Sequence, residues 1–239
     1  MQQKRERIWE LDALRGFCIL CVIFIHFMFD LVYFLGLDVH FPPVYVFIQQ
    51  YGGVIFVILS GICVTLGSHS VKRGAIVFGC GMLITLVTFG IYKLGMAAED
   101  IIVKFGVLHL LGICMLSYPI FKKLSPAAQA VLGSGIVILG YVFTTIYVQS
   151  HWLFPFGLIY HSFTSSDYFP LFPQLGWFLI GAAIGRTVYA DRKTKLPGTA
   201  QNFFLIRFFR WCGRQSLWIY LLHQPVVYGL IELVVFLKR

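Results

Sequence analysis

The stretch Leu11–Leu31, LDALRGFCILCVIFIHFMFDL, contains the features that decide the fold class. Most of it is an uninterrupted apolar run, long enough for a helix that crosses the hydrocarbon core of a bilayer. Asp12 and Arg15 stand near its start, while His26 and Asp30 stand inside the apolar part. Ionisable side chains inside a membrane span cost free energy, so they are by default candidates for function.

An α-helix over this stretch brings three of the ionisable residues onto one face. From Arg15 to His26 the helix turns by about 1,100°, roughly 20° past three full turns, and Asp30 follows one turn later. A neutral imidazole is a competent general base near pH 7, and a carboxylate beside it orients the ring and stabilises its charged form. His26 and Asp30 are therefore candidate catalytic residues. The alternative interpretation is that they bond each other and only hold helices together.

The rest of the chain repeats the apolar pattern. Of its 239 residues, 59% are hydrophobic and 12% are charged, whereas soluble domains have about a quarter charged residues. Continuous apolar runs predict an all-α, polytopic membrane bundle that forms one domain over residues 1–239, and they do not fit the alternating pattern of a β-barrel. The first run is too long for a signal peptide, so we expect it to remain. We expect seven spans, at about residues 13–35, 44–66, 75–94, 101–121, 127–148, 171–190 and 213–237.

The basic residues predict the orientation of these spans. With the N-terminus in the cytosol, fifteen of the 19 lysines and arginines fall on the cytosolic side and four on the outer side. Cytosolic loops carry an excess of basic residues, so the pattern favours a cytosolic N-terminus and an outer C-terminus. It also explains the net charge of +9 without nucleic acid as a partner.

Two loops differ from ordinary connections. The outer loop at residues 149–170 is aromatic, lacks lysine and arginine, and contains His161, Asp167 and Tyr168. Its aromatic residues either anchor the chain at the membrane interface or form a lid or acceptor-binding surface. The inner segment NFFLIRFFRWCGR predicts an amphipathic helix on the membrane, with arginines on one face. These arginines either attract anionic lipid or hold an anionic cytosolic ligand such as a phosphorylated cofactor. They are Arg207, Arg210 and Arg214.

Two further spans contain histidine. His109 lies in FGVLHLLG, and His223 lies in GRQSLWIYLLHQPVVYG, on the same helix face as Ser216 and Tyr220. Pro225 frees a backbone carbonyl in that helix, which membrane proteins tolerate where the carbonyl lines a cavity. We interpret these four polar residues as a supporting site; the alternative for each histidine is an ordinary packed, hydrogen-bonded side chain.

The cysteines do not indicate a metal site. The chain has six, mostly within apolar runs, where cysteine usually packs as a small apolar residue. Their spacing does not match a four-ligand zinc site. We therefore expect no bound metal.

Four segments carry a resemblance to a known family. LDALRGFCILCVIFIHF resembles the opening of membrane-embedded acyltransferases, in which an arginine precedes a first-span histidine by eleven positions, as Arg15 precedes His26. The whole chain resembles bacterial proteins related to the catalytic domain of heparan-α-glucosaminide N-acetyltransferase. The supporting segments are HFMFDLVYF, FGVLHLLG, SSDYFPLFPQLGWFLIGAAIG and GRQSLWIYLLHQP.

The resemblance implies transfer of an acyl group, typically acetyl from cytosolic acetyl-CoA, to a hydroxyl or amine of a sugar, glycan or glycolipid at the outer face of a bacterial inner membrane. His26 inherits the catalytic role and Arg15 a role near the donor. Basic residues at the cytosolic rim are then candidates for the coenzyme A phosphates: Arg15, Lys72, Arg73, Lys122, Lys123, Arg207, Arg210 and Arg214. Candidates on the acceptor side are Asp167, Tyr168, His161 and His40.

Two other functions fit the same residues. His26 and Asp30 suit a proton relay in a proton-coupled transporter, and histidines on facing spans suit a haem protein with two axial histidines. The sequence leaves open the acceptor, the acyl chain length, an acyl-histidine intermediate and the oligomeric state, a homo-oligomer included.

Overall fold

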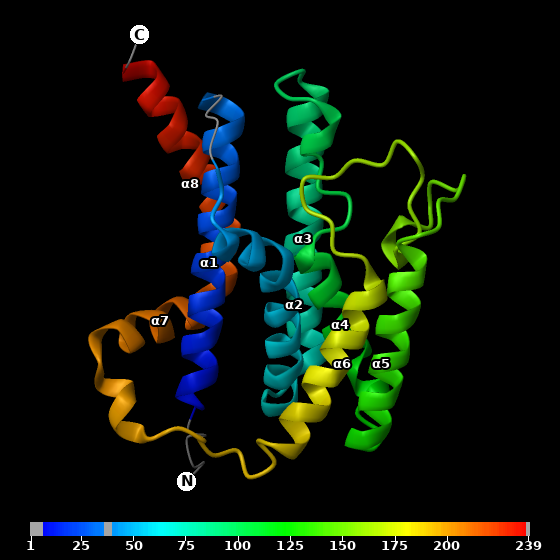
Figure 1. Cartoon of the computed structure of the whole chain (residues 1–239), viewed down its shortest axis with the longest axis vertical. Coiled ribbons are helices and arrows are strands. Elements are labelled where there is room, and N and C mark those ends of the chain that lie inside the picture. The colour runs from blue at the N-terminus through cyan, green and yellow to red at the C-terminus, as the bar shows by residue number, and fades with distance from the viewer. Residues whose placement is uncertain (1–6, 36–39, 238–239) are drawn as a thin grey trace. The chain divides into compact units, whose positions relative to one another are not determined.

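The computed structural model describes the backbone of residues 7–35 and 40–237, without the side chains of residues 29, 30, 33–35 and 231–237. Within these ranges the chain is all-α, as predicted: β-structure is limited to two isolated bridges, Phe105 with Tyr168 and Tyr147 with Ile159. The helices (Figure 1) are α1 (Trp9–Leu35), α2 (Pro43–Leu66), α3 (Ser70–Lys93), α4 (Val107–Phe121), α5 (Pro126–Phe143), α6 (Leu171–Thr187), α7 (Phe204–Arg214) and α8 (Ser216–Leu237). Short 3₁₀ turns occur at Glu99–Ile101, Phe154–Phe156 and Gly198–Asn202.

Most helix bounds lie within a few residues of the expected spans, with three larger differences. The span expected from residue 75 begins earlier, at Ser70, and the span expected to end at residue 148 is shorter, because α5 ends at Phe143. Among the described residues, α1, α2, α3 and α5 are long and apolar enough to cross a membrane. The span expected from residue 101 starts too early, because the chain forms a 3₁₀ turn at Glu99–Ile101 and the helix begins at Val107. The count of seven spans and the cytosolic N-terminus stay predictions.

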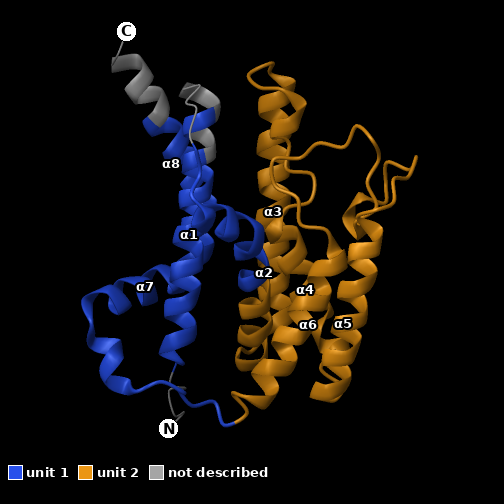
Figure 2. Ribbon diagram, viewed as in Figure 1, with its two compact units in different colours: residues 1–56, 191–239 blue, residues 57–190 orange. Residues whose placement is uncertain are grey.

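The chain divides into two compact units (Figure 2). Unit 1 contains residues 1–56 and 191–239, and unit 2 contains residues 57–190. The first half of α2 belongs to unit 1 and the second half to unit 2. The single domain expected over residues 1–239 stays a prediction.

In unit 1, α1 packs against α7 and α8. Two glycines let the backbones of α1 and α7 touch: a Cβ atom on Gly16 would overlap the carbonyl of Phe209, and one on Gly213 would overlap the carbonyl of Asp12. Asp12 also accepts a hydrogen bond from Arg214 Nε at 3.5 Å. The start of α1 and the end of α7 therefore form one rigid corner.

In unit 2, α3 packs against α4 and α5 against α6. The second half of α2 lies against α6, because a Cβ atom on Gly61 would overlap the carbonyl of Phe178 and one on Gly181 would overlap that of Ile58. Small residues at such contacts are how membrane helices associate where lipid removes the hydrophobic driving force.

A matched pair of glycine substitutions tests this packing. We expect Gly61→Ala to lower the stability of the protein by about 1–3 kcal/mol, because the new methyl group meets a backbone carbonyl that cannot move cheaply. Gly79→Ala is the control, since nothing lies within 4 Å of a Cβ atom there, and alanine favours a helix by up to about 1 kcal/mol. Thermal unfolding of both variants in detergent makes the comparison. Equal losses at the two positions would contradict the α2–α6 contact.

Candidate functional site

The polar face of α1 meets α8 inside unit 1. Arg15 Nη2 donates a hydrogen bond to Ser216 Oγ at 2.7 Å, and the Ser216 side chain is buried. Farther along both helices, the rings of His26 and His223 lie with their centroids 5.1 Å apart and are tilted by 57°. The order of the two pairs means that α1 and α8 run in the same direction. Four predicted residues thus meet in two pairs, with Arg15 and Ser216 at one end and the two histidines at the other.

The hydrogen bonding of His223 sets the chemistry of its ring. Its Nδ1 atom lies 2.5 Å from the carbonyl oxygen of Tyr220. A carbonyl only accepts, so Nδ1 carries the proton, and in a neutral ring Nε2 is then the basic nitrogen. Tyr220 also contacts the ring, with the centroids 5.3 Å apart. Asp30, the predicted partner of His26, lies on α1, but its side chain is outside the described residues, so its role stays a prediction.

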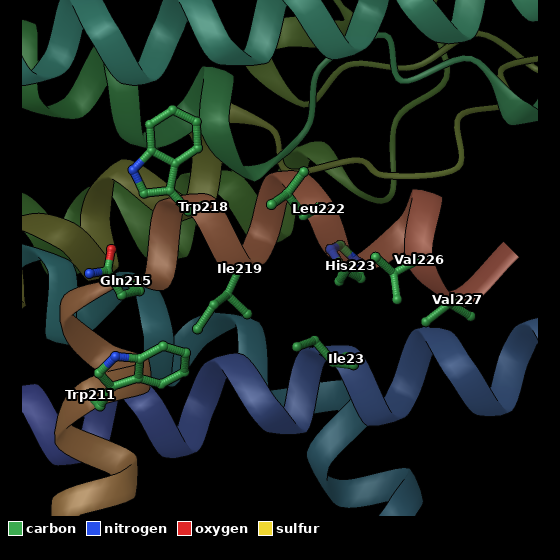
Figure 3. Close-up of a pocket in the computed structure, with 9 residues that line it drawn as sticks. All are labelled: Ile23, Trp211, Gln215, Trp218, Ile219, Leu222, His223, Val226 and Val227. Carbon is green, nitrogen blue, oxygen red and sulfur yellow. The ribbon is translucent and has the colours of Figure 1, made fainter. Parts of the chain in front are cut away.

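An apolar groove of about 460 Å³ runs along α8 past His223. Figure 3 shows that its lining side chains come mainly from α7 and α8, with Ile23 from α1, and that Trp211 and Gln215 lie at one end and Val226 and Val227 at the other. Most of its lining is aliphatic or aromatic. The remaining lining residues are Ile23, Trp218, Ile219, Leu222 and His223.

A second, basic cavity of about 230 Å³ lies on α7. It is lined by Arg207, Arg210, Trp211 and Arg214, so the arginine face predicted from the sequence is present on a helix. Trp211 lines both cavities, which places the basic cavity next to the apolar groove. Guanidinium groups bind phosphate oxygens with two parallel hydrogen bonds, so this cavity suits a phosphate group.

Glu10 anchors the connection that leads into α7, a role that sequence reasoning missed. Its carboxylate is buried and accepts hydrogen bonds from the Thr194 hydroxyl and the Lys195 backbone N–H, each at 2.7 Å. In sequence, Glu10 looks like an ordinary acidic residue in the first turn of a helix, because its partners lie 184 and 185 residues away.

His109 belongs to unit 2, and both of its ring nitrogens are engaged there. The Gly106 backbone N–H donates to Nδ1 at 3.2 Å, and Nε2 lies 3.2 Å from the Thr85 hydroxyl. That hydroxyl donates to the Val103 carbonyl at 2.6 Å, so it accepts from Nε2–H. Since one nitrogen accepts and the other donates, His109 is a neutral, fully bonded side chain, which favours the packed alternative over a catalytic role.

Asp167 joins the loop at residues 149–170 to α4, and Tyr168 joins two parts of this loop to each other. Asp167 Oδ2 accepts a hydrogen bond from the Val107 backbone N–H at 3.0 Å, which caps the helix, and the Tyr168 hydroxyl donates to the Phe154 carbonyl at 2.6 Å. Burial raises the pKa of the Tyr168 hydroxyl. His161 stacks on Tyr147, with the ring centroids 4.5 Å apart. His40, in unit 1, is exposed.

The other basic candidates gather at one end of unit 2. Lys72 and Arg73 lie in the first turn of α3, and Lys122 and Lys123 directly follow α4. Gly74 contacts α4 near Leu116, so the start of α3 and the end of α4 lie together. This clustering is typical of a cytosolic face. Across the described part of the chain, no three His, Cys, Asp or Glu residues gather as a metal site.

Two substitutions separate the capping role of Asp167 from a role in binding. We expect Asp167→Ala to lower the free energy of unfolding by about 0.5–2 kcal/mol, because α4 loses a hydrogen bond at its first turn. We expect Asp167→Asn to keep most of the parental stability, since asparagine also caps helices. Thermal unfolding in detergent measures both. A loss in Asp167→Asn as large as that in Asp167→Ala would contradict the cap.

The comparison with known families agrees with these observations. Residues 7–225 match the family model described as heparan-alpha-glucosaminide N-acetyltransferase, catalytic, and the match includes α1, α7 and the first turns of α8. No curated protein and no solved structure matches the chain. The chain therefore belongs to the heparan-α-glucosaminide N-acetyltransferase catalytic family, a family of membrane acetyltransferases.

Proposed function

We propose that this protein transfers an acyl group from cytosolic acyl-CoA to a hydroxyl or amine of a sugar-like acceptor on the other side of a bacterial cytoplasmic membrane. The observation that carries the proposal is the contact between the His26 and His223 rings, beside an apolar groove, in a chain of this family. Two ionisable side chains that face each other inside a membrane cost free energy, so their presence indicates a function.

The donor binds at the end of unit 1 where α1 begins and α7 ends. With the N-terminus in the cytosol, this end faces the cytosol, where acyl-CoA is made. The arginines of α7 bind the coenzyme A phosphates, and the groove leads from them toward His223. Arg15 fixes the position of Ser216, and with it the first turn of α8, through their hydrogen bond. The basic residues at one end of unit 2, Lys72, Arg73, Lys122 and Lys123, stay candidates for attracting the anionic donor.

The transfer follows general base catalysis. A neutral His26 removes the proton from the acceptor hydroxyl or amine, whose lone pair attacks the thioester carbonyl. The tetrahedral intermediate collapses, the C–S bond breaks, and the coenzyme A sulfur takes the proton from the imidazolium. Asp30, one turn away, orients the His26 ring and stabilises its charged form. The ring of His223 is held by the hydrogen bond from its Nδ1–H to the Tyr220 carbonyl, and it keeps the ring of His26 in place.

The acceptor approaches from the outer side. Its candidate contacts are His40 in unit 1 and, in unit 2, His161, Asp167 and Tyr168. Of these, His161 and His40 are exposed and suit direct contact with the hydroxyl groups of a sugar. Asp167 and Tyr168 act through the loop, which they hold in position.

The haem alternative fits the geometry less well, and the transporter alternative differs from the enzyme in its product. The His26 and His223 rings touch, and this leaves no space between them for a porphyrin, as two axial ligands would need. A proton-coupled transporter would move its substrate unchanged, so a covalent product distinguishes it from the enzyme. A liposome assay with labelled acetyl-CoA and outside acceptor makes this distinction.

Substitution of His26 tests the catalytic assignment. We expect His26→Ala to reduce transfer of label from acetyl-CoA by at least about 100-fold, because loss of a positioned base typically costs 10²–10⁴-fold. The matched control is His151→Ala, which removes an exposed histidine from the outer loop. Both proteins should unfold at temperatures close to the parent. Transfer at the parental rate in a folded His26→Ala protein would remove His26 from this role.

Substitution of the α7 arginines tests the donor site. We expect Arg207→Gln and Arg210→Gln to raise KM for acetyl-CoA about 5- to 20-fold each with a smaller change in kcat, because they lose charged hydrogen bonds to phosphate of about 1–2 kcal/mol. Arg192→Gln is the control, since it removes the same charge from the exposed connection before α7. An equal rise in KM in the control would indicate that acetyl-CoA is attracted by the overall positive charge and does not bind in a specific pocket on α7.

A further inference from the structure

We infer that α7 lies in the surface of the bilayer, with Phe204, Phe208 and Trp211 inserted among the phospholipids. Lipid is then the partner of the face of α7 that the described part of the chain leaves uncovered. The inference goes beyond the proposed function, because it concerns how one surface is occupied and holds without any acyl transfer. It also places the basic cavity of α7 at the level of the lipid phosphates.

One side of α7 is closed by α1. A Cβ atom on Gly213 would overlap the carbonyl of Asp12, and Cys212 beside it is buried. The Phe209 ring packs edge-on against Phe17 of α1, with the ring centroids 5.7 Å apart. Successive residues of a helix are separated by about 100°, so these three residues of α7 share one side. This side is therefore occupied by the protein itself.

A second side of α7 carries an exposed apolar stripe. Phe204, Phe208 and Trp211 follow one another at spacings of four and three residues, so they lie on one face of the helix. Their exposed fractions are 84%, 42% and 58%. An exposed apolar patch with polar residues at its edge marks a site of interaction with a protein or a membrane. The stripe is therefore a surface that takes another molecule as its partner.

The contact with α1 sets the depth of α7 in the membrane. The apolar stretch of α1 that is long enough to cross a bilayer begins at Trp9. Asp12 and Gly16, which touch α7, follow Trp9 by three and seven residues. They thus lie about 5–10 Å inside this stretch, at a rise of roughly 1.5 Å per residue, and interfacial helices bury their apolar face to about this depth. Figure 1 shows α7 crossing α1, and a helix that crosses a membrane span lies along the membrane surface.

The arrangement of charge on α7 fits a phospholipid surface. Trp211 also lines the apolar groove that follows α8 toward His223, so the stripe lies on the side of α7 that faces the membrane interior. The arginines lie about a quarter of a turn around the helix from the stripe, and α7 contains no acidic residue. Lipid phosphates complement this charge at the depth where the stripe enters the acyl chains. A protein partner would need apolar and acidic groups in the same arrangement, which a bilayer offers everywhere on its surface.

The test uses quenching of tryptophan fluorescence by bromine atoms on lipid acyl chains. The full chain is placed in phosphatidylcholine nanodiscs that contain lipid brominated either near the headgroup or near the end of the acyl chain. The difference in emission between the parent and Trp211→Phe isolates Trp211. We expect bromine near the headgroup to reduce this difference by at least about twofold, and bromine near the chain end to reduce it less, as for an interfacial helix.

The matched control for this measurement is Trp9→Phe. Trp9 lies at the same end of the apolar stretch of α1, but it is only 5% exposed. We expect the emission isolated by Trp9→Phe to change little with either brominated lipid, because the protein covers this ring.

Two variants that add a tryptophan test whether the whole helix lies in the surface. Phe204 stands at the start of α7 and Leu196 in the connection before it, and both are exposed, so a larger ring fits without disturbing the fold. We expect the emission added by Phe204→Trp to be quenched by the same lipid as that of Trp211. We expect the emission added by Leu196→Trp to be quenched less, because Leu196 follows Lys195, which bonds to Glu10 at the start of α1.

Three results would overturn the inference. Emission of Trp211 that neither lipid quenches would mean that another protein or water covers the stripe. Stronger quenching by bromine near the chain end would place α7 in the hydrocarbon core. Equal quenching in Phe204→Trp and Leu196→Trp would remove the distinction between the helix and the connection before it. Because no step uses acyl-CoA, these results leave the proposed function standing, and a failure of acetyl transfer leaves the membrane contact of α7 standing.

Discussion

The direct contact between the backbones of α1 and α7 is the constraint on which unit 1 depends. Gly16 and Gly213 allow carbonyl groups of the opposite helix to occupy the space where a side chain would lie. This contact fixes the start of α8, two residues after α7 ends, and therefore the register in which Ser216 meets Arg15 and His223 meets His26. The buried carboxylate of Glu10 secures the same corner from the other side. The two glycines thus set the geometry of His26 and His223, each of which lies ten residues along the chain from one of them.

Hydrogen bonding separates two histidines that look alike in sequence. His109 and His26 both stand in apolar helices, where an unpaired polar group costs several kcal/mol. For His109, a backbone amide and the Thr85 hydroxyl occupy both nitrogens, and two aromatic rings cover the imidazole, that of Phe105 stacked on it and that of Phe78 edge-on. His26 instead faces a second titratable ring across a helix contact. The first arrangement stabilises a fold, whereas the second brings two imidazole rings together beside the apolar groove that His223 lines.

The sequence predicted the parts of this structure that arise from local periodicity. The helices, the shared face of Arg15 and His26, and the arginine face of α7 all follow from apolar and basic residues that recur at helical spacing. The parts it did not predict depend on distant contacts. The first turn of α4 is capped by Asp167, which lies sixty residues later in the sequence. Glu10 has partners that no local pattern marks, and the groove beside His223 exists because α1, α7 and α8 meet. Asp167 shows the same limit, since the sequence predicts a carboxylate in a loop but not the cap that it provides to α4.

The hydrogen bond from Arg15 to Ser216 joins residues 201 positions apart, and this has a consequence for biogenesis. Ribosomes add about 5–20 residues per second, so α1 leaves the ribosome roughly 10–40 s before α8. During that time the guanidinium of Arg15 and the imidazole of His26 lack their eventual neighbours and must be tolerated by the membrane or by insertion machinery. The contacts between α1 and α8 are consequently among the last to form, and a chain that ends before α8 lacks the pairing of His26 with His223.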